Sequence, residues 1–189
     1  MKRIFYIAAF LFLFISCKNE QKNSSNSIKI RGKEQSELLY TYHKADSLYY
    51  IGIIDTNLFN LFIEQTLSFS GNFPEDPIAP DMLSKAGVAT MILAKSSTNR
   101  KQSLEYAKKG LDIFNKIQKI YPEYESVKNC YINRAIIYDD IIGDYPSAEY
   151  EYRDFIHRYP NDTLTESIKN YLPFLGRSTD EIAEELKIN

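Results

Sequence analysis

The sequence contains no tryptophan, and glycine and proline are scarce, at seven residues each. Few helix breakers, together with 15 tyrosines and 11 phenylalanines, favour long helices over a β-sandwich rich in turns. The net charge of −2, without a concentrated basic face, argues against a nucleic-acid binder. With 189 residues, 44% of them hydrophobic, the chain is sufficient for one globular domain with a sizeable core.

Catalytic motifs are also missing. There are two histidines, His43 and His157, and no HExxH, GxSxG, Walker or CxxC motif. Cys130 borders an apolar helix face, which is typical of a small buried hydrophobe rather than a nucleophile. The best carboxylate pair for acid–base or cation chemistry is Asp139 with Asp140, and a solvated helix end is the alternative. We therefore expect no enzyme, no catalytic or metal site, no cofactor and no small-molecule substrate.

The longest apolar run at the N-terminus, from Ile4 to Ile15, is too short to cross a membrane. As a helix it measures about 18 Å, against roughly 30 Å of hydrocarbon. Lys2 and Arg3 precede it, and a small residue and a cysteine follow it. This order predicts a secretory signal peptide over 1–16, with an uncleaved anchor as the alternative.

The end of this segment resembles a bacterial lipobox, with the sequence Phe14-Ile15-Ser16-Cys17. The resemblance implies cleavage before Cys17 and acylation of that residue, and two or more acyl chains anchor a protein stably. Lys18 stands where an inner-membrane retention signal would have Asp, which favours the outer membrane. No acidic cluster of the kind that marks surface export follows, which favours its periplasmic face. The polar residues 17–33 predict a flexible tether.

Helical periodicity runs through the body of the chain, residues 34–176. It predicts helices over 57–70, 101–120, 124–142 and 146–159. The helix over 124–142 is apolar over more than half its circumference and should lie buried between neighbours. An aromatic residue followed by proline ends three of the helical segments, at Phe73-Pro74, Tyr121-Pro122 and Tyr159-Pro160. Spacings of this size with helical pairs between them indicate an α-solenoid.

The last helical pair resembles a tetratricopeptide repeat. The match rests on small residues and aromatics that allow close helix packing, a glycine turn and a terminating proline, namely Ala135, Tyr138, Gly143-Asp144-Tyr145, Ala148, Tyr152 and Pro160. One departure is the distance from Tyr138 to Gly143, which is a residue longer than usual. A middle copy rests on Ala89, Gly110, Phe114 and Pro122, and a degenerate first copy covers about 34–74.

The predicted fold is therefore all-α, a short α-solenoid of about three helical hairpins with C-terminal capping helices. A helical bundle without repeats is the alternative. Residues 162–176 supply an amphipathic capping helix, and a capping box opens a short final helix within 177–189. The C-terminal stretch is also similar to envelope tetratricopeptide lipoproteins, including relatives of one that assists β-barrel insertion into the outer membrane.

A solenoid binds partners on the inner surface formed by the first helix of each pair. In the last pair, the predicted contact residues are Asn129, Asn133, Ile137 and Asp140, with Ser126 on the same line. They do not resemble the Lys/Asn clamp with which tetratricopeptide domains bind C-terminal carboxylates. A separate Asp-Thr-Leu tripeptide resembles an O-glycosylation site at Thr163, and an N-cap aspartate is the alternative explanation.

Together these features predict a lipid-anchored tetratricopeptide scaffold that binds another envelope protein in outer-membrane or cell-wall assembly. An accessory lipoprotein of a secretion or motility system is the first alternative. An enzyme whose catalytic residues follow no known motif is the second.

Overall fold

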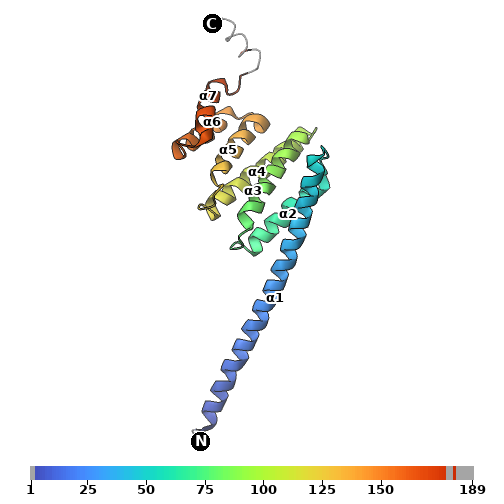
Figure 1. Ribbon diagram of the computed structural model, residues 1–189, viewed down its shortest axis with the longest axis vertical. Coiled ribbons are helices and arrows are strands. Elements are labelled where there is room, and N and C mark those ends of the chain that lie inside the picture. Colours follow the sequence, from blue (N-terminus) through green and yellow to red (C-terminus); the bar gives the residue numbers. More distant parts are fainter. Residues whose placement is uncertain (1–2, 178–180, 182–189) are drawn as a thin grey trace.

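The protein is all-helical, as the sequence predicts (Figure 1). The computed structural model describes the backbone of residues 3–177 and 181 and the side chains of residues 26–177 and 181. No strand occurs among these residues. The elements in chain order are α1 (Arg3–Tyr50), α2 (Thr56–Asn72), α3 (Ala79–Ser96), α4 (Arg100–Ile120), α5 (Lys128–Ile136), the π-helix η1 (Ile137–Ile142), α6 (Tyr145–Arg158), α7 (Thr163–Tyr171) and the 3₁₀-helix η2 (Leu172–Phe174).

Each helix packs mainly against the next one along the chain, which produces three consecutive hairpins and a terminal helix (Figure 1). The hairpins are α1–α2, α3–α4 and α5/η1–α6, and α7 covers the last of them. The predicted helices over 57–70, 101–120 and 146–159 are confirmed within two residues at each end. The final helix predicted within 177–189 lies outside the described residues except at 177 and 181.

Helix α1 extends well beyond the other helices at its N-terminal side (Figure 1). It continues through 18–33, which differs from the flexible tether that the sequence predicts. The segment contains no proline, and its lysine, glutamate, glutamine and arginine residues are good helix formers. Described side chains from 26 to 33 are all exposed, and the first buried residue of α1 is Leu38. Only the C-terminal part of α1 therefore contributes to the core.

The three aromatic–proline pairs form joints of nearly the same geometry. Phe73, Tyr121 and Tyr159 each end a helix, with φ between −133° and −124° and ψ between 56° and 62°. Each donates its N–H to the carbonyl four residues earlier, and each carbonyl accepts the N–H three residues later at 3.0 Å. The proline cannot continue the helix, so the chain turns at the same point three times.

The second helix of every hairpin also begins in the same way. Asp55, Asn99 and Asp144 are the N-caps of α2, α4 and α6, and each side chain accepts a hydrogen bond from the N–H three residues later, at 3.0 to 3.3 Å. A side-chain oxygen in this position satisfies a backbone donor that has no partner within the helix. The three N-caps lie 44 and 45 residues apart in the sequence. Together with the aromatic–proline joints, they show that both ends of the second helix repeat along the chain.

The one-residue excess between Tyr138 and Gly143 is accommodated by a π-helix. The N–H of Gly143 donates to the carbonyl of Tyr138, five residues earlier, at 2.8 Å. Gly143 has a φ of +80°, a left-handed conformation that suits glycine at a helix end. The helix predicted over 124–142 begins later than expected, at Lys128, because a turn follows Pro122.

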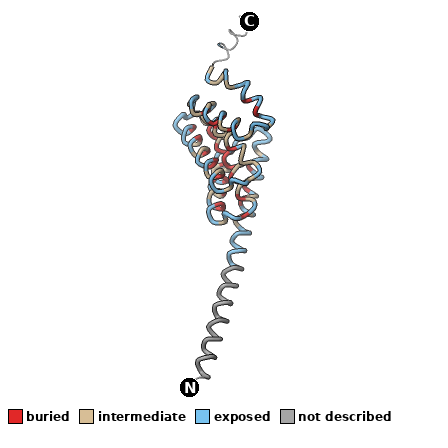
Figure 2. The backbone as a smooth tube through the Cα atoms, turned by 90° about the vertical axis from the view of Figure 1, so that its left-hand side faces the viewer, coloured by how far each residue is buried: buried red, intermediate tan, exposed pale blue. Residues whose placement is uncertain are grey.

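Buried residues form two clusters along the middle of the packed helices (Figure 2). The larger cluster joins α1 to α4 and includes Cys130, Ile137 and Ile141 from α5 and η1. The smaller one contains Ala135 of α5 together with residues of α6 and α7. Helix α5 with η1 thus lies between both clusters, which confirms the prediction that this helix is buried between neighbours.

Two glycines allow close packing in the middle of the molecule. A Cβ atom on Gly87 of α3 would lie 2.5 Å from the ring of Phe114 on α4. A Cβ atom on Gly110 of α4 would lie 2.5 Å from Oγ1 of Thr90 and 3.0 Å from Cδ1 of Ile137. All three distances are shorter than van der Waals contact, so the α3–α4 hairpin and its contact with η1 require glycine at these positions.

Candidate protein-binding groove

The first helices of the hairpins form a groove between α1, α3 and the start of α5. One part of it is a hollow of about 290 Å³. The floor is apolar, with Ala45, Phe59, Phe62 and Ala89. The polar side chains along its walls are Tyr42, Asp46, Asp81, Ser84, Lys85, Tyr124, Ser126 and Asn129.

One polar cluster connects the three walls of this hollow. Lys85 Nζ donates to both carboxylate oxygens of Asp81 at 2.7 Å and lies 5.5 Å from the ring centroid of Tyr42. The hydroxyl of Tyr124 donates to Asp81 Oδ1 at 3.4 Å. The cluster therefore holds α1, α3 and the α4–α5 connection in a fixed relation around the hollow.

The ionisation of this cluster is stable around neutral pH. Burial raises the pKa of Tyr42, and the negative charge of Asp46 raises it further. Burial is also the main cause of the raised pKa of Tyr124. For Lys85, burial lowers the pKa, but the hydrogen bond and charge of Asp81 outweigh it and the net shift is upward. Both tyrosines thus stay neutral and Lys85 stays charged around neutral pH.

The groove continues into a second, more apolar hollow of about 420 Å³ toward the α1–α2 turn. Tyr49, Val88 and Ile92 line both hollows. The other lining residues are Ile54, Met91, Lys95, Ser96 and Asn133. The groove is therefore polar at one end and mainly apolar at the other.

The structure separates the contact residues predicted in the last hairpin. Asn129 lines the polar hollow, and Asn133 lines the apolar one. Asp140 lies farther along, where it accepts a hydrogen bond from Lys95 at 2.7 Å. Ile137 is fully buried in the larger core, which corrects its place in the predicted surface, because its side chain packs against α4 at Gly110.

Most of the groove comes from α1 and α3, for which the sequence predicts no contact residues. The pattern that marks them is an i, i+3, i+4, i+7 series of polar and apolar residues. In α1 the series is Tyr42, Ala45, Asp46 and Tyr49, and in α3 it is Asp81, Ser84, Lys85 and Val88. Such a series marks one helix face, but only the packed hairpins show that the two faces converge.

The other candidate residues from the sequence, Asp139, Asp140, Cys130 and Thr163, lie outside the groove. Asp139 accepts a hydrogen bond from the hydroxyl of Tyr171 at 2.5 Å and so connects η1 to α7. Asp140 forms an ion pair with Lys95 and so connects η1 to α3. Cys130 is buried, and burial raises the pKa of its thiol to about 12, so no thiolate forms near neutral pH. Thr163 is exposed at the start of α7, directly after the N-cap Asp162.

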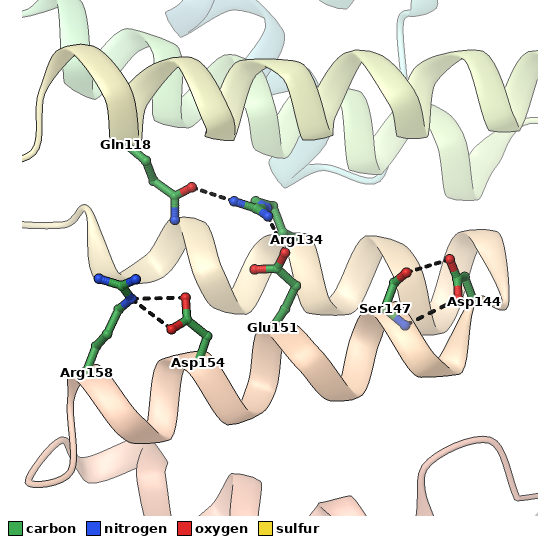
Figure 3. Close-up of polar contacts among 7 residues, drawn as sticks. All are labelled: Gln118, Arg134, Asp144, Ser147, Glu151, Asp154 and Arg158. Carbon is green, nitrogen blue, oxygen red and sulfur yellow. Dashed lines mark hydrogen bonds and ion pairs between the residues drawn. The ribbon is translucent and has the colours of Figure 1, made fainter.

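A buried ion pair lies where the two cores meet (Figure 3). Arg134 of α5 donates to Glu151 of α6 and, at 2.5 Å, to the side-chain oxygen of Gln118 on α4. Burial raises the pKa of Glu151, and the charge of Arg134 only partly opposes this. Nε of Arg134 and Oε2 of Glu151 are buried without a hydrogen-bond partner. The pair joins three helices and lines neither of the two hollows of the groove, so it contributes to the packing of α4, α5 and α6.

Within the described part of the chain, no group of three or more His, Cys, Asp or Glu residues is arranged to hold a metal ion. Among the same residues, none of the helices combines the length and hydropathy needed to span a membrane. The side chain of Cys17 lies outside the residues whose side chains are described. Comparison with family models, curated proteins and solved structures finds no match for this chain.

Proposed function

We propose that this protein is a tetratricopeptide-type scaffold that binds another protein through the groove between α1, α3 and α5. The observation that carries this proposal is the convergence of the first helices of three hairpins on one hollow. Its support is the repetition of the hairpin itself, with matching N-caps and matching aromatic–proline ends in all three copies.

The groove has the chemistry of a binding surface rather than of a catalytic site. Its floor is apolar, its walls carry tyrosines, amides and two carboxylates, and its two lysines, Lys85 and Lys95, already form ion pairs. Aromatic side chains of this kind supply much of the energy at protein interfaces at a small cost in conformational entropy.

We further propose that Cys17 carries a lipid anchor that holds the scaffold at the periplasmic face of the outer membrane. A tether of this kind raises the effective concentration of the groove near envelope partners. At 1.5 Å per residue, the helical stretch of α1 from residue 17 to residue 50 measures about 50 Å. A continuous α1 would then place the groove well away from the bilayer surface, within reach of periplasmic or barrel-bound domains.

Site-specific photo-crosslinking in the native cells tests the groove. A photoreactive phenylalanine analogue replaces Tyr49, which lines the groove, or Tyr40, which is equally part of α1 but is 68% exposed and lines none of the hollows described above. We expect a discrete protein adduct from position 49 and none from position 40. No adduct at 49, or the same adducts from both positions, would contradict binding through the groove.

Fractionation of a Cys17→Ala variant tests the anchor. We expect the wild-type protein in the membrane fraction and the variant in the soluble fraction, with mass spectrometry showing acyl chains on the wild type alone. A variant that stays in the membrane fraction would show that Cys17 is not the anchor, without bearing on the groove.

A further inference from the structure

We propose that the groove binds a short amphipathic segment of a partner protein, whose apolar side chains occupy the Tyr49–Ile54 end and whose lysine or arginine pairs with Asp46. This inference rests on the proposed function, because it assigns a ligand class to the same groove. It is carried by the uneven distribution of charge and apolar surface along the groove.

The polar end of the groove favours a cation. Asp81 already forms an ion pair with Lys85, at 2.7 Å. Asp46, by contrast, is exposed on the wall of the same hollow, and no ion pair of its carboxylate occurs among the described residues. The hollow therefore presents one uncompensated negative charge to a ligand, and an acidic segment would be repelled by it.

The aromatic side chains near Asp46 add to this preference. Tyr42 already has the ammonium group of Lys85 over its ring, at 5.5 Å from the centroid. Tyr49 lies three residues after Asp46 on the same helix face and is 45% exposed. A partner's lysine or arginine at Asp46 would lie next to this second ring, where a cation–π contact supplements the ion pair.

The opposite end of the groove requires an apolar ligand. Tyr49, Ile54 and Val88 are large hydrophobic residues that remain 38 to 45% exposed, and all three line the second hollow. Met91 and Ile92 lie beside them. Exposed apolar side chains that gather around one hollow mark a site of protein contact, in contrast to single exposed residues elsewhere on the surface.

The two ends are close enough for one short segment to reach both. Along α3, the groove extends from Asp81 to Ile92, a rise of about 16 Å. This length corresponds to about three turns of a bound helix or to about five residues of extended chain. The apolar and basic side chains of the ligand therefore belong to a single linear segment.

Fluorescence anisotropy with two labelled peptides tests the ligand class on the purified chain. One peptide is an amphipathic helix of about 12 residues built from leucine and lysine, and the other has glutamate in place of every lysine. We expect the leucine–lysine peptide to bind about tenfold more tightly or better. Asp46→Lys should weaken its binding about tenfold, whereas Asp112→Lys should not, because Asp112 is an exposed residue of α4 that lines no part of the groove.

The matched variants separate the groove from general charge effects. Tyr49→Ala should weaken binding, and Tyr40→Ala on the same helix should leave it unchanged. Equal binding of both peptides, or equal losses from the two aspartate variants, would overturn the proposal, and so would the absence of any binding. Crosslinking from position 49 still reports on the proposed function in that case, because it does not depend on the class of ligand.

Discussion

The α3–α4 and α5–α6 hairpins have similar ends but different interiors. In both, a side chain caps the second helix, Asn99 in α4 and Asp144 in α6. In both, an aromatic residue before proline ends that helix, Tyr121 or Tyr159. Both ends of the second helix therefore repeat the same hydrogen-bond pattern, even where the packing between the helices differs.

Both interiors contain apolar residues, but they differ in one buried contact. Between α3 and α4, Gly87 brings the backbone close to the ring of Phe114, and the contact is apolar. Between α5 and α6, Arg134 and Glu151 form a buried ion pair. The caps and turns are therefore the shared features of the two hairpins, whereas the contacts between their helices differ. The ion pair also contacts Gln118 of α4, where the two cores meet.

Breaking the buried ion pair should have the largest effect on stability. Arg134→Ala or Glu151→Ala leaves one charge buried and unpaired, so we expect each to lower the free energy of unfolding by about 3–5 kcal/mol. The double variant Arg134→Met with Glu151→Leu removes both charges and should be far less destabilised than the sum. Urea unfolding followed by circular dichroism measures all three. If the single variants were as stable as the wild type, the pair would not hold the α5–α6 hairpin.

Gly87→Ala should have the next largest effect, because its new methyl group would meet the ring of Phe114 at 2.5 Å. Overpacking of this kind costs about 1–3 kcal/mol. Gly71→Ala is the matched control, since Gly71 is also helical and a Cβ atom there has no neighbour within 4 Å. We expect that control to be neutral or more stable by about 0.5 kcal/mol, because alanine is the better helix former. Equal thermal midpoints for both variants would contradict the close α3–α4 contact.

Features that depend on local chemistry could be predicted from the sequence. The all-α class follows from helical periodicity, and the helix ends at Tyr121 and Tyr159 follow from the proline that comes next. The burial of helix α5 between two neighbours follows from its wide apolar face. Each of these predictions needs only information from residues a few positions apart.

Features that depend on how distant segments meet could not be predicted. The π-helix shows in the sequence only as an extra residue before Gly143, and a loop of one more residue would have the same signature. The surroundings of Ile137 depend on α4, and the groove depends on α1 and α3 meeting at Tyr42 and Lys85. The helix over 18–33 could not be distinguished from a flexible tether, since a polar composition suits either one.

The three N-caps provide a smaller, graded test of the repeated hairpin. Replacing Asp55, Asn99 or Asp144 with alanine removes one hydrogen bond to a backbone N–H and should cost about 1 kcal/mol each. The cost should be greatest at Asp144, because its second carboxylate oxygen also accepts the hydroxyl of Ser147 at 2.6 Å. Thermal unfolding of the three variants measures the order. A cap with no effect would mark the hairpin whose second helix is fixed by packing alone.

The smallest effect concerns the pH dependence of the α5–α6 interior. Burial raises the pKa of Glu151 above its ordinary 4.5, so between these two values the folded state binds more protons than the unfolded state. The contribution of Glu151 to stability is therefore fully present below about pH 4.5 and is lost as the pH rises through the folded-state pKa. Glu151→Gln cannot titrate and should lack this loss.

Unfolding free energies of the wild type and of Glu151→Gln, measured from about pH 4 upward, isolate this group. The lower limit matters because Asp162 acts in the opposite direction. The N–H of Leu164 and the ammonium group of Lys128 lower its pKa below 3.8, so its contribution is lost only at lower pH. The difference between the two proteins should shift in favour of the glutamine variant as the pH rises. A constant difference would mean that Arg134 compensates the burial of Glu151 fully, which would make this ion pair as insensitive to pH as the apolar contact between Gly87 and Phe114.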